Sequence, residues 1–253
     1  MSPPRVALVT GAGSPTGIGF ACARRFVEAG IQVLVTSTTE RIFDRVAELG
    51  GESAAAGHVA DLTEEAQAEQ LVAAAIERFG GLNIVVNNAG MTSVAQPSTS
   101  SRLIDSTLEE WRSSLDRDLT TAFLVTRASL PRLLEAGWGR IVNVASVTGP
   151  VMAMRDDAAY AAGKAGMVGM TRALALDVAA RDITVNAVAP GWIDTGSSNE
   201  HERAMGRATP ARRSGTADEV AAAVAFLAGD GAAYITGQTL VIDGGNSIME
   251  ERG

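Results

Sequence analysis

The chain has 253 residues, of which 46% are hydrophobic and 20% charged, and its formal net charge is −8 at pH 7. This composition is typical of a globular protein with a substantial core. The acidic balance argues against nucleic acid or an anionic membrane as the main partner. A single cysteine, Cys22, excludes an internal disulfide, and no apolar run approaches the ~18 residues of a membrane-spanning helix. We therefore expect a cytoplasmic protein.

Short apolar, β-branched runs alternate with longer segments of helical periodicity along the whole chain. Strands are predicted at 6–10, 33–36, 58–60, 84–86, 141–144, 184–188 and 240–242. Helices are predicted at 17–29, 40–49, 64–79, 107–136, 158–180 and 217–228. Strands that are apolar on both faces and separated by helices predict an α/β fold. We expect a doubly wound Rossmann-type sheet of seven mostly parallel strands with helices on both faces, in one domain spanning 1–253.

Two stretches interrupt this alternation. Residues 91–106 are rich in serine and threonine, and residues 191–216 contain four glycines and Pro210. Both follow strands, and the loops at the carboxyl ends of strands form the ligand crevice in such folds. We interpret 191–216 as a substrate lid with short helical pieces around 200–205, the alternative being a surface loop without a role.

The first predicted strand continues into a turn with four glycines. Glycine allows the backbone to turn sharply and to approach a pyrophosphate closely. The helix that follows offers unpaired amide groups and the positive end of its dipole to the phosphates. Glycines alone could mark an ordinary tight turn, but the succession of strand, turn, helix and strand favours a dinucleotide. The expected cofactor-binding residues here are Gly11, Gly13, Ser14, Thr16, Gly17, Ile18 and Gly19.

The end of the second strand bears on the choice between NADP and NAD. A carboxylate that binds the adenosine ribose is usual at this position, whereas here Ser37 and Thr38 occupy it and Arg41 follows. Without that carboxylate a 2′-phosphate is not repelled, and the two hydroxyls and the guanidinium could bind it. We expect NADP, while NAD stays possible because Glu40 is a nearby negative charge.

Tyr160 and Lys164 are four residues apart, which places them on one face of a helix. A nearby ammonium lowers the pKa of a phenol, so Tyr160 could exchange a proton with a substrate oxygen. Ser146 follows the strand 141–144 and could hydrogen-bond the same oxygen. Tyr160 and Lys164 alone could be an ordinary surface pair, but a serine at the carboxyl end of a strand favours a catalytic group.

These segments resemble the short-chain dehydrogenase/reductase family over nearly the whole chain, from 6 to about 246. The turn from Thr10 to Gly19 is similar to the family's Thr-Gly-x-x-x-Gly-x-Gly but has two more residues, and Asn87-Asn88-Ala89-Gly90 matches its Asn-Asn-Ala-Gly segment. The resemblance implies further cofactor contacts near the adenine, along the central strand, and at the nicotinamide ribose and carboxamide. Their residues are Asp61, Leu62, Asn88, Ala89, Gly90, Tyr160, Lys164, Pro190, Gly191, Ile193 and Thr195.

The resemblance also implies hydride transfer between a nicotinamide and a carbonyl or alcohol carbon, with Ser146, Tyr160 and Lys164 as catalytic residues and no metal. The family often has an asparagine on its central helix that holds a relay water behind the lysine, and the matching residue here is Asp118. Asp118 could hold the water, pair with Lys164, or act as a near-isostere of little kinetic effect. Between Ser146 and Tyr160 the chain has one residue more than is usual, within 149–157.

The chain looks most like bacterial 3-oxoacyl-(acyl-carrier-protein) reductases and the oxidoreductases near them. Carrier protein is acidic, yet residues 135–138 include no basic side chain and the net charge is −8. We therefore predict a general carbonyl/alcohol oxidoreductase, with the carrier-protein reductase and a catalytically silent nucleotide-binding protein as alternatives. Helices 107–136 and 158–180 carry leucine and alanine on more than one face, which favours a homotetramer.

Overall fold

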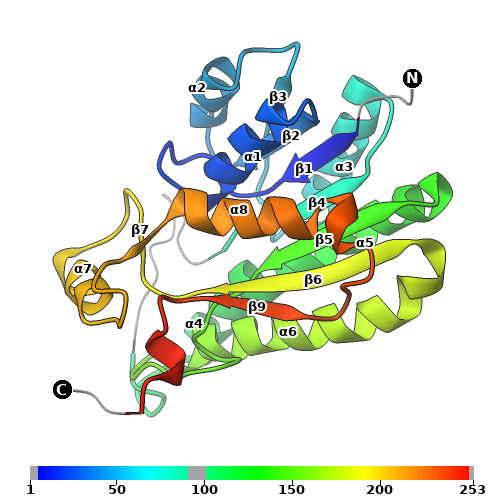
Figure 1. The fold of residues 1–253 in the computed structure, drawn as a ribbon. Coiled ribbons are helices and arrows are strands. Elements are labelled where there is room, and N and C mark those ends of the chain that lie inside the picture. The colour runs from blue at the N-terminus through cyan, green and yellow to red at the C-terminus, as the bar shows by residue number, and fades with distance from the viewer. Residues whose placement is uncertain (1–4, 91–100, 251–253) are drawn as a thin grey trace.

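A computed structural model describes residues 5–90 and 101–250, and a parallel sheet forms the centre of this part of the chain (Figure 1). Seven strands lie in the order β3-β2-β1-β4-β5-β6-β9, and every neighbouring pair is parallel. The order reverses between β1 and β4, and in open α/β sheets a ligand crevice is usual at the carboxyl ends of strands at such a point. The strands are β1 (Val6–Val9), β2 (Gln32–Ser37), β3 (Ala55–Val59), β4 (Ile84–Asn87), β5 (Gly139–Val144), β6 (Ile183–Pro190) and β9 (Thr239–Ile242).

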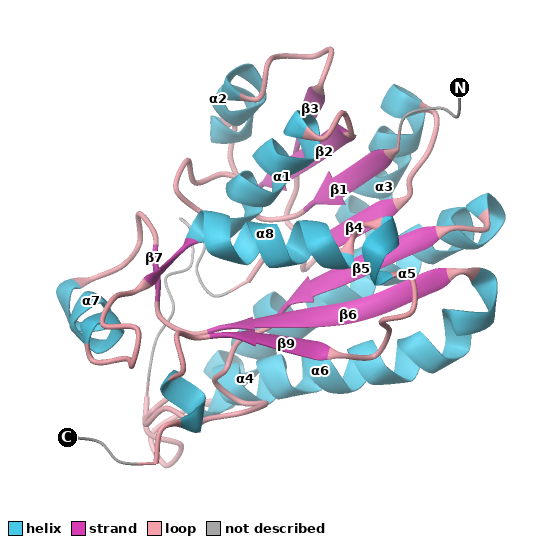
Figure 2. Cartoon of the chain, viewed as in Figure 1, coloured by secondary structure: helices cyan, strands magenta, loops and turns pink. Residues whose placement is uncertain are grey.

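Helices cover both faces of the sheet, which confirms the predicted fold class (Figure 2). One face packs against α1 (Ile18–Glu28), α2 (Arg41–Glu48) and α8 (Ala217–Leu227). The other packs against α3 (Glu65–Phe79), α5 (Thr121–Ala136) and α6 (Ala158–Val178), with α4 (Leu108–Leu115) beside α6. Successive strand residues alternate between the two cores, so Val33 and Val35 belong to the first core and Leu34 to the second.

The boundaries of β3 differ from the predicted strand 58–60. The observed strand begins at Ala55, in a sequence of two alanines and a glycine that lacks the β-branched residues of a typical strand. A Cβ on Gly57 would lie 3.1 Å from side-chain atoms of both Phe43 and Val46, so the close packing of α2 excludes a larger residue there. The packing of the helix, which is not visible in the local sequence, decides where this strand begins.

The predicted helix 107–136 is in fact three elements, and this part of the prediction was wrong. Between α4 and α5 the chain forms a π-helical turn, η1 (Asp116–Thr120). A π-helical turn accommodates an extra residue, is rare in proteins and is frequent at functional sites. It turns Asp118 into the protein, where the residue is 1% exposed. The start of α4 is stabilised by a capping box between Thr107 and Glu110.

The segment 191–216 lies beyond the carboxyl ends of the strands (Figure 1). It contains a two-stranded parallel sheet of β7 (Ile193–Asp194) and β8 (Gly215–Thr216), and between them α7 (Glu200–Arg207). The helical piece predicted around 200–205 is confirmed. Of the other irregular stretch, 91–106, the first ten residues lie outside the described part of the chain.

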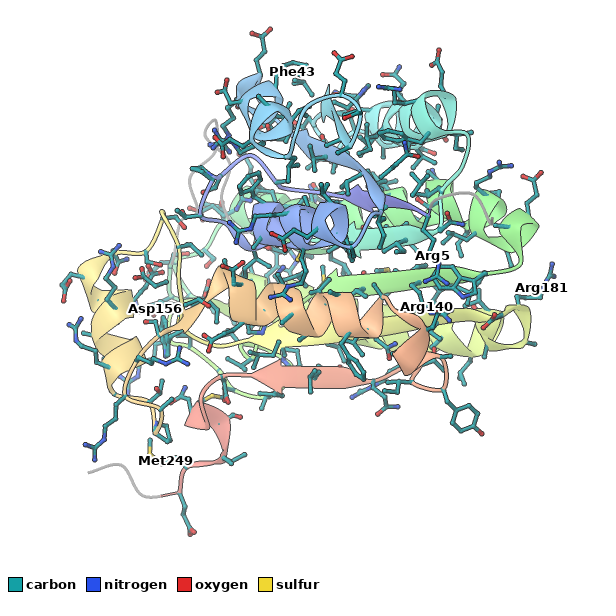
Figure 3. The ribbon with its side chains drawn as sticks, turned by 45° about the horizontal axis from the view of Figure 1, so that its top comes forward. Arg5, Phe43, Arg140, Asp156, Arg181 and Met249 are labelled. Carbon is teal, nitrogen blue, oxygen red and sulfur yellow. The ribbon has the colours of Figure 1, made fainter. Side chains whose placement is uncertain are left out.

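A buried arginine lies at the amino ends of β5 and β6. Arg140 donates through Nη1 to the carbonyl oxygens of Gly139 and Asp182 at 2.8 Å, and its guanidinium lies 4.2 Å from the ring centre of Trp138. Burial lowers the pKa of Arg140. Figure 3 shows Arg140 and Arg5 at one end of the molecule and Asp156 at the other, where the carboxyl ends of the strands lie. In the described residues, no helix is both long and apolar enough to cross a membrane.

Candidate active site

The glycine-rich turn and the end of β4 hold each other in place. Thr10 accepts hydrogen bonds at Oγ1 from the backbone N–H groups of Asn88 and Ala89, both at 2.9 Å. Asn88 donates through Nδ2 to the carbonyl oxygens of Thr10 and Gly11, both at 3.0 Å. Gly11 has a φ of +68°, and a Cβ on Gly19 would lie 2.6 Å from Asn88 Nδ2. The turn therefore requires glycine at both positions, and Thr10 is a structural partner that the sequence analysis did not single out.

Ser37 and Arg41 meet the turn at Gly13. A Cβ there would lie 2.6 Å from Arg41 Nε and 2.7 Å from Ser37 Cβ. The Ser37 hydroxyl donates to the carbonyl oxygen of Thr39 at 2.7 Å, whereas Thr38 and Arg41 are exposed. Ser37, Thr38 and Arg41 thus form a cradle at the glycine-rich turn, in which Ser37 and Arg41 make the close contacts with Gly13. The fit to a dinucleotide with a 2′-phosphate is good, because that group needs a cation there.

The predicted adenine-side residues lie in the turn between β3 and α3. Leu62 is buried, while the exposed Asp61 carboxylate accepts hydrogen bonds from the backbone N–H and the hydroxyl of Thr63 at 3.0 and 2.7 Å. The backbone N–H of Asp61 donates to Gln67 Oε1 at 2.9 Å. These bonds hold the loop after β3 in one conformation at the same sheet edge as the glycine-rich turn.

The predicted nicotinamide-side residues lie in the segment that follows β6. Pro190 ends β6, and the backbone N–H of Gly191 donates to the carbonyl oxygen of Ile242 at 2.9 Å. Ile193 lies on β7, and the Thr195 backbone N–H donates to Ser198 Oγ at 3.0 Å.

Thr16 links this segment to the glycine-rich turn. Its Oγ1 accepts a hydrogen bond of 2.7 Å from the backbone N–H of Gly196. A Cβ on Gly196 would lie 2.7 Å from the same oxygen, so the approach is close. The lengthened part of the turn around Ser14 and Thr16 therefore reaches the predicted lid, a contact that the sequence did not indicate.

The structure brings the three predicted catalytic side chains together at the carboxyl end of β5. Ser146 is buried just after the strand, and its Oγ accepts a hydrogen bond from the backbone N–H of Thr148 at 3.1 Å. Lys164 is 4% exposed on α6, donates to the carbonyl oxygen of Val144 at 3.2 Å, and lies 5.6 Å from the ring centre of Tyr160. Tyr160 is half-buried on the same helix, one turn earlier.

The direction of the Tyr160 pKa corrects one expectation. We expected the ammonium of Lys164 to lower the pKa of the phenol. Instead burial raises the pKa of Tyr160 above its ordinary value, a hydrogen bond with Ser146 lowers it in part, and the charges of Asp118 and Asp157 raise it. The two carboxylates oppose the effect that the lysine alone would have on the pKa of the phenol.

The wall between Ser146 and Tyr160 is built on a tight turn. The backbone N–H of Gly149 donates to the carbonyl oxygen of Met152 at 2.8 Å, and Asn246 Nδ2 lies 3.6 Å from Met152 Sδ. Val151 and Met154 are exposed and apolar. This part of the wall therefore contacts the C-terminal part of the chain through Met152. Among the described residues, no cluster of three or more His, Cys, Asp or Glu side chains could hold a metal ion.

Comparison with known proteins identifies close relatives over almost the full length. A family model described as enoyl-(acyl carrier protein) reductase matches residues 11–247. The 3-oxoacyl-[acyl-carrier-protein] reductase FabG of Vibrio cholerae is 40% identical over 95% of this chain and 96% of the relative. The proteins of the same name from Pseudomonas aeruginosa and Escherichia coli are 40% and 38% identical, with the same coverage.

Proposed function

We propose that this chain, which belongs to the short-chain dehydrogenase/reductase family, uses NADP(H) to interconvert a carbonyl and a secondary alcohol with Tyr160 as the general acid and base. The coarse activity follows from the family: the protein is an NAD(P)(H)-dependent oxidoreductase acting on CH–OH and C=O groups. The preference for NADP, the roles of individual residues, the assembly and a cytoplasmic location are our proposals.

The observation that carries the catalytic assignment is the convergence of Ser146, Tyr160 and Lys164 at the carboxyl end of β5, one strand away from the β4 end that holds the glycine-rich turn. When bound, the nicotinamide supplies or takes up the hydride. In reduction the Tyr160 hydroxyl gives its proton to the carbonyl oxygen, and in oxidation the phenolate takes that proton back. The Ser146 hydroxyl, buried next to the strand end, donates a hydrogen bond to the same oxygen and stabilises the charge that develops on it.

Replacement of Tyr160 by phenylalanine tests this assignment. General acid–base catalysis typically contributes about 10²–10⁴-fold, so Tyr160→Phe should reduce NADPH-dependent ketone reduction by at least ~10²-fold while cofactor binding persists. The only other tyrosine, Tyr234, is fully exposed, and Tyr234→Phe is the matched control. Equal rates for Tyr160→Phe and the wild type on every active substrate would show that the assignment is wrong.

The cradle of Ser37, Thr38 and Arg41 supports the preference for NADP. A hydrogen bond to a charged group contributes about 1.5–3 kcal/mol, which corresponds to roughly 10- to 150-fold in affinity. Arg41→Ala should weaken NADPH binding by that factor and leave NADH binding unchanged, as measured by fluorescence titration. Comparable affinities of the wild type for NADH and NADPH would contradict the proposal.

Reduction of an acyl-carrier-protein thioester is the second candidate function, and the names of the relatives favour it. Two observations argue against it: the net charge of −8, and the exposed end of α5, where Arg132 is paired with Glu135. A carrier-protein reductase should have a much higher kcat/KM for a 3-oxoacyl group on the carrier protein than on a small thiol. Equal values on the two thioesters would eliminate this candidate.

The surface supports a homotetramer. Leu240 and Val241 are exposed on the edge strand β9 and Leu176 is exposed on α6, while Leu108 and Phe123 are exposed on α4 and α5. An uncovered edge strand and apolar patches of this kind are normally buried in an assembly. Two distinct surfaces on one chain are sufficient to build a tetramer with dihedral symmetry. Light scattering at micromolar concentration should give four chains, and a monomer would refute the proposal.

A further inference from the structure

The chain contains one lysine, Lys164, and the structure buries it against a carboxylate. Asp118 Oδ1 lies 3.6 Å from Lys164 Nζ, and the two residues are 1% and 4% exposed. Asp118 Oδ2 also accepts a hydrogen bond from the Ser114 hydroxyl at 3.4 Å. A buried carboxylate is strongly disfavoured without a partner, and so is a buried ammonium. Each charge is therefore the reason that the other can stay in the protein interior.

The backbone is shaped to bring these two charges together. The π-helical turn η1 directs Asp118 inward, and two glycines leave room for it. A Cβ on Gly163 would lie 3.0 Å from Asp118 Cβ, and one on Gly90 would lie 2.9 Å from Asp118 Oδ1 and 3.3 Å from Lys164 Nζ. Gly163 and Lys164 are adjacent on α6, so the same helix supplies both the space and the charge. The backbone around Asp118 therefore has the shape that its close approach to Lys164 requires.

The charged groups around this pair are few. On α6 they are Lys164, the titratable Tyr160 and, at the residue before the helix, Asp157. From η1 the other cation, Arg117, donates to Ser113 Oγ at 3.1 Å, toward α4. The neighbouring α4 residue Ser114 is uncharged, and so are Val144 and Ser146 at the end of β5. Within the described part of the chain, the charges that act here are the carboxylates of Asp118 and Asp157 and the ammonium of Lys164.

Burial sets the direction of two pKa values, and the carboxylates modify both of them. Burial lowers the pKa of Lys164, and Asp118 opposes this through its charge and a hydrogen bond. The charges of Asp118 and Asp157 add to the effect of burial in raising the pKa of Tyr160. Removal of the Asp118 charge should lower the pKa of both groups. The direction of these two pKa changes does not depend on whether Lys164 or Tyr160 loses its proton first.

We propose that Asp118 is a positioning residue whose carboxylate retains the ammonium on Lys164 and the proton on Tyr160, so that the site can still donate a proton to a carbonyl oxygen in alkaline solution. This deepens the proposed function and rests on it for the role of the proton. The geometry of Asp118 and Lys164 does not depend on the substrate, so their protonation can be measured without an assay of substrate turnover.

The single lysine permits a direct test by nuclear magnetic resonance. Protein labelled with ¹³C at the lysine ε-carbon should give one signal, which reports the protonation of Lys164 with and without NADP⁺. We expect an ammonium in the wild type at neutral and mildly alkaline pH, and loss of the proton at lower pH in Asp118→Asn. Asp116→Asn is the matched control, because Asp116 lies on the same turn but is exposed and contacts Thr120.

Either a neutral amine in the wild type at neutral pH or coincident titrations of wild type and Asp118→Asn would overturn the proposal. The wild-type spectrum decides on its own if Asp118→Asn does not fold. These spectra need no substrate, so failure of the proposed oxidoreductase function would leave them interpretable.

The pH profile of ketone reduction is the second readout. Turnover of Asp118→Asn near neutral pH should stay within about tenfold of the wild type, because Tyr160 and Lys164 are both present. The alkaline limb of its profile should move to lower pH, so that on this limb the rate falls roughly threefold or more below that of Asp116→Asn. A structural role would lower the rate equally at all pH values, and an unshifted limb would overturn the proposal.

Discussion

A buried chain of polar side chains joins the strands and helices that carry the active site, and its removal has a calculable effect. Asn87 at the end of β4 donates through Nδ2 to Thr126 Oγ1 on α5 and to Asn143 Oδ1 on β5, both at 2.8 Å. Asn143 Nδ2 in turn donates to Thr171 Oγ1 on α6, also at 2.8 Å. Thr171 lies three turns after Tyr160 on that helix, so the chain fixes α6 against β5.

The substitution Thr171→Val keeps the shape of the side chain and removes the acceptor for Asn143. A buried donor left without a partner destabilises a protein by about 1–3 kcal/mol. For a domain of this size each kcal/mol lowers Tm by roughly 2–4 °C, so we expect a decrease of about 2–12 °C. Thermal unfolding followed by circular dichroism, at one protein concentration for all variants, measures it.

Ser129→Ala is the control for this experiment. Ser129 is also buried, but its hydroxyl donates only to the Val125 carbonyl oxygen, at 2.7 Å within α5. Loss of this hydroxyl leaves no buried donor without a partner, so the Tm of Ser129→Ala should decrease less than that of Thr171→Val. If Thr171→Val unfolds at the wild-type temperature, or Ser129→Ala is the less stable of the two, the reasoning about the orphaned Asn143 amide is refuted.

Two further predictions follow from single contacts. Burial raises the pKa of the Cys22 thiol to about 12. At pH 8 the thiol should therefore stay protonated, and a thiol reagent should modify it only after denaturation. Rapid modification of the native protein would contradict this prediction. Thr16→Val removes the acceptor for the Gly196 N–H, and a neutral hydrogen bond contributes about 0.5–1.5 kcal/mol. Proteolysis within 191–216 should therefore accelerate roughly 2- to 10-fold. Thr16→Ser is the control and should keep the wild-type rate. Equal cleavage of Thr16→Val and the wild type would show that this contact does not restrain the segment.

The features that the sequence predicted well are those whose physical cause is local. Alternation of apolar strands with helical segments specifies a parallel sheet because each strand must be buried on both faces. The glycines of the first turn are required by backbone conformation and close approach, as Gly11 and Gly19 show. Tyr160 and Lys164 share a face because of helical periodicity alone. A resemblance to known proteins strengthened each of these predictions.

The features that the sequence did not predict depend on contacts between distant segments. Nothing in residues 107–136 distinguishes a continuous helix from one interrupted by η1, since the turn is favoured by the burial of Asp118 against Lys164. The link between Thr16 and Gly196 likewise joins residues 180 positions apart.

The same distinction applies to the chemistry at Tyr160. The sequence alone predicted which groups exchange the proton, because a phenol, an ammonium and a hydroxyl at this spacing on a strand end and a helix favour this role. The tertiary structure decided how firmly that proton is held. Burial and the charges of Asp118 and Asp157 act through space on the phenol, and their sum raises its pKa where the nearest cation in the sequence would have lowered it.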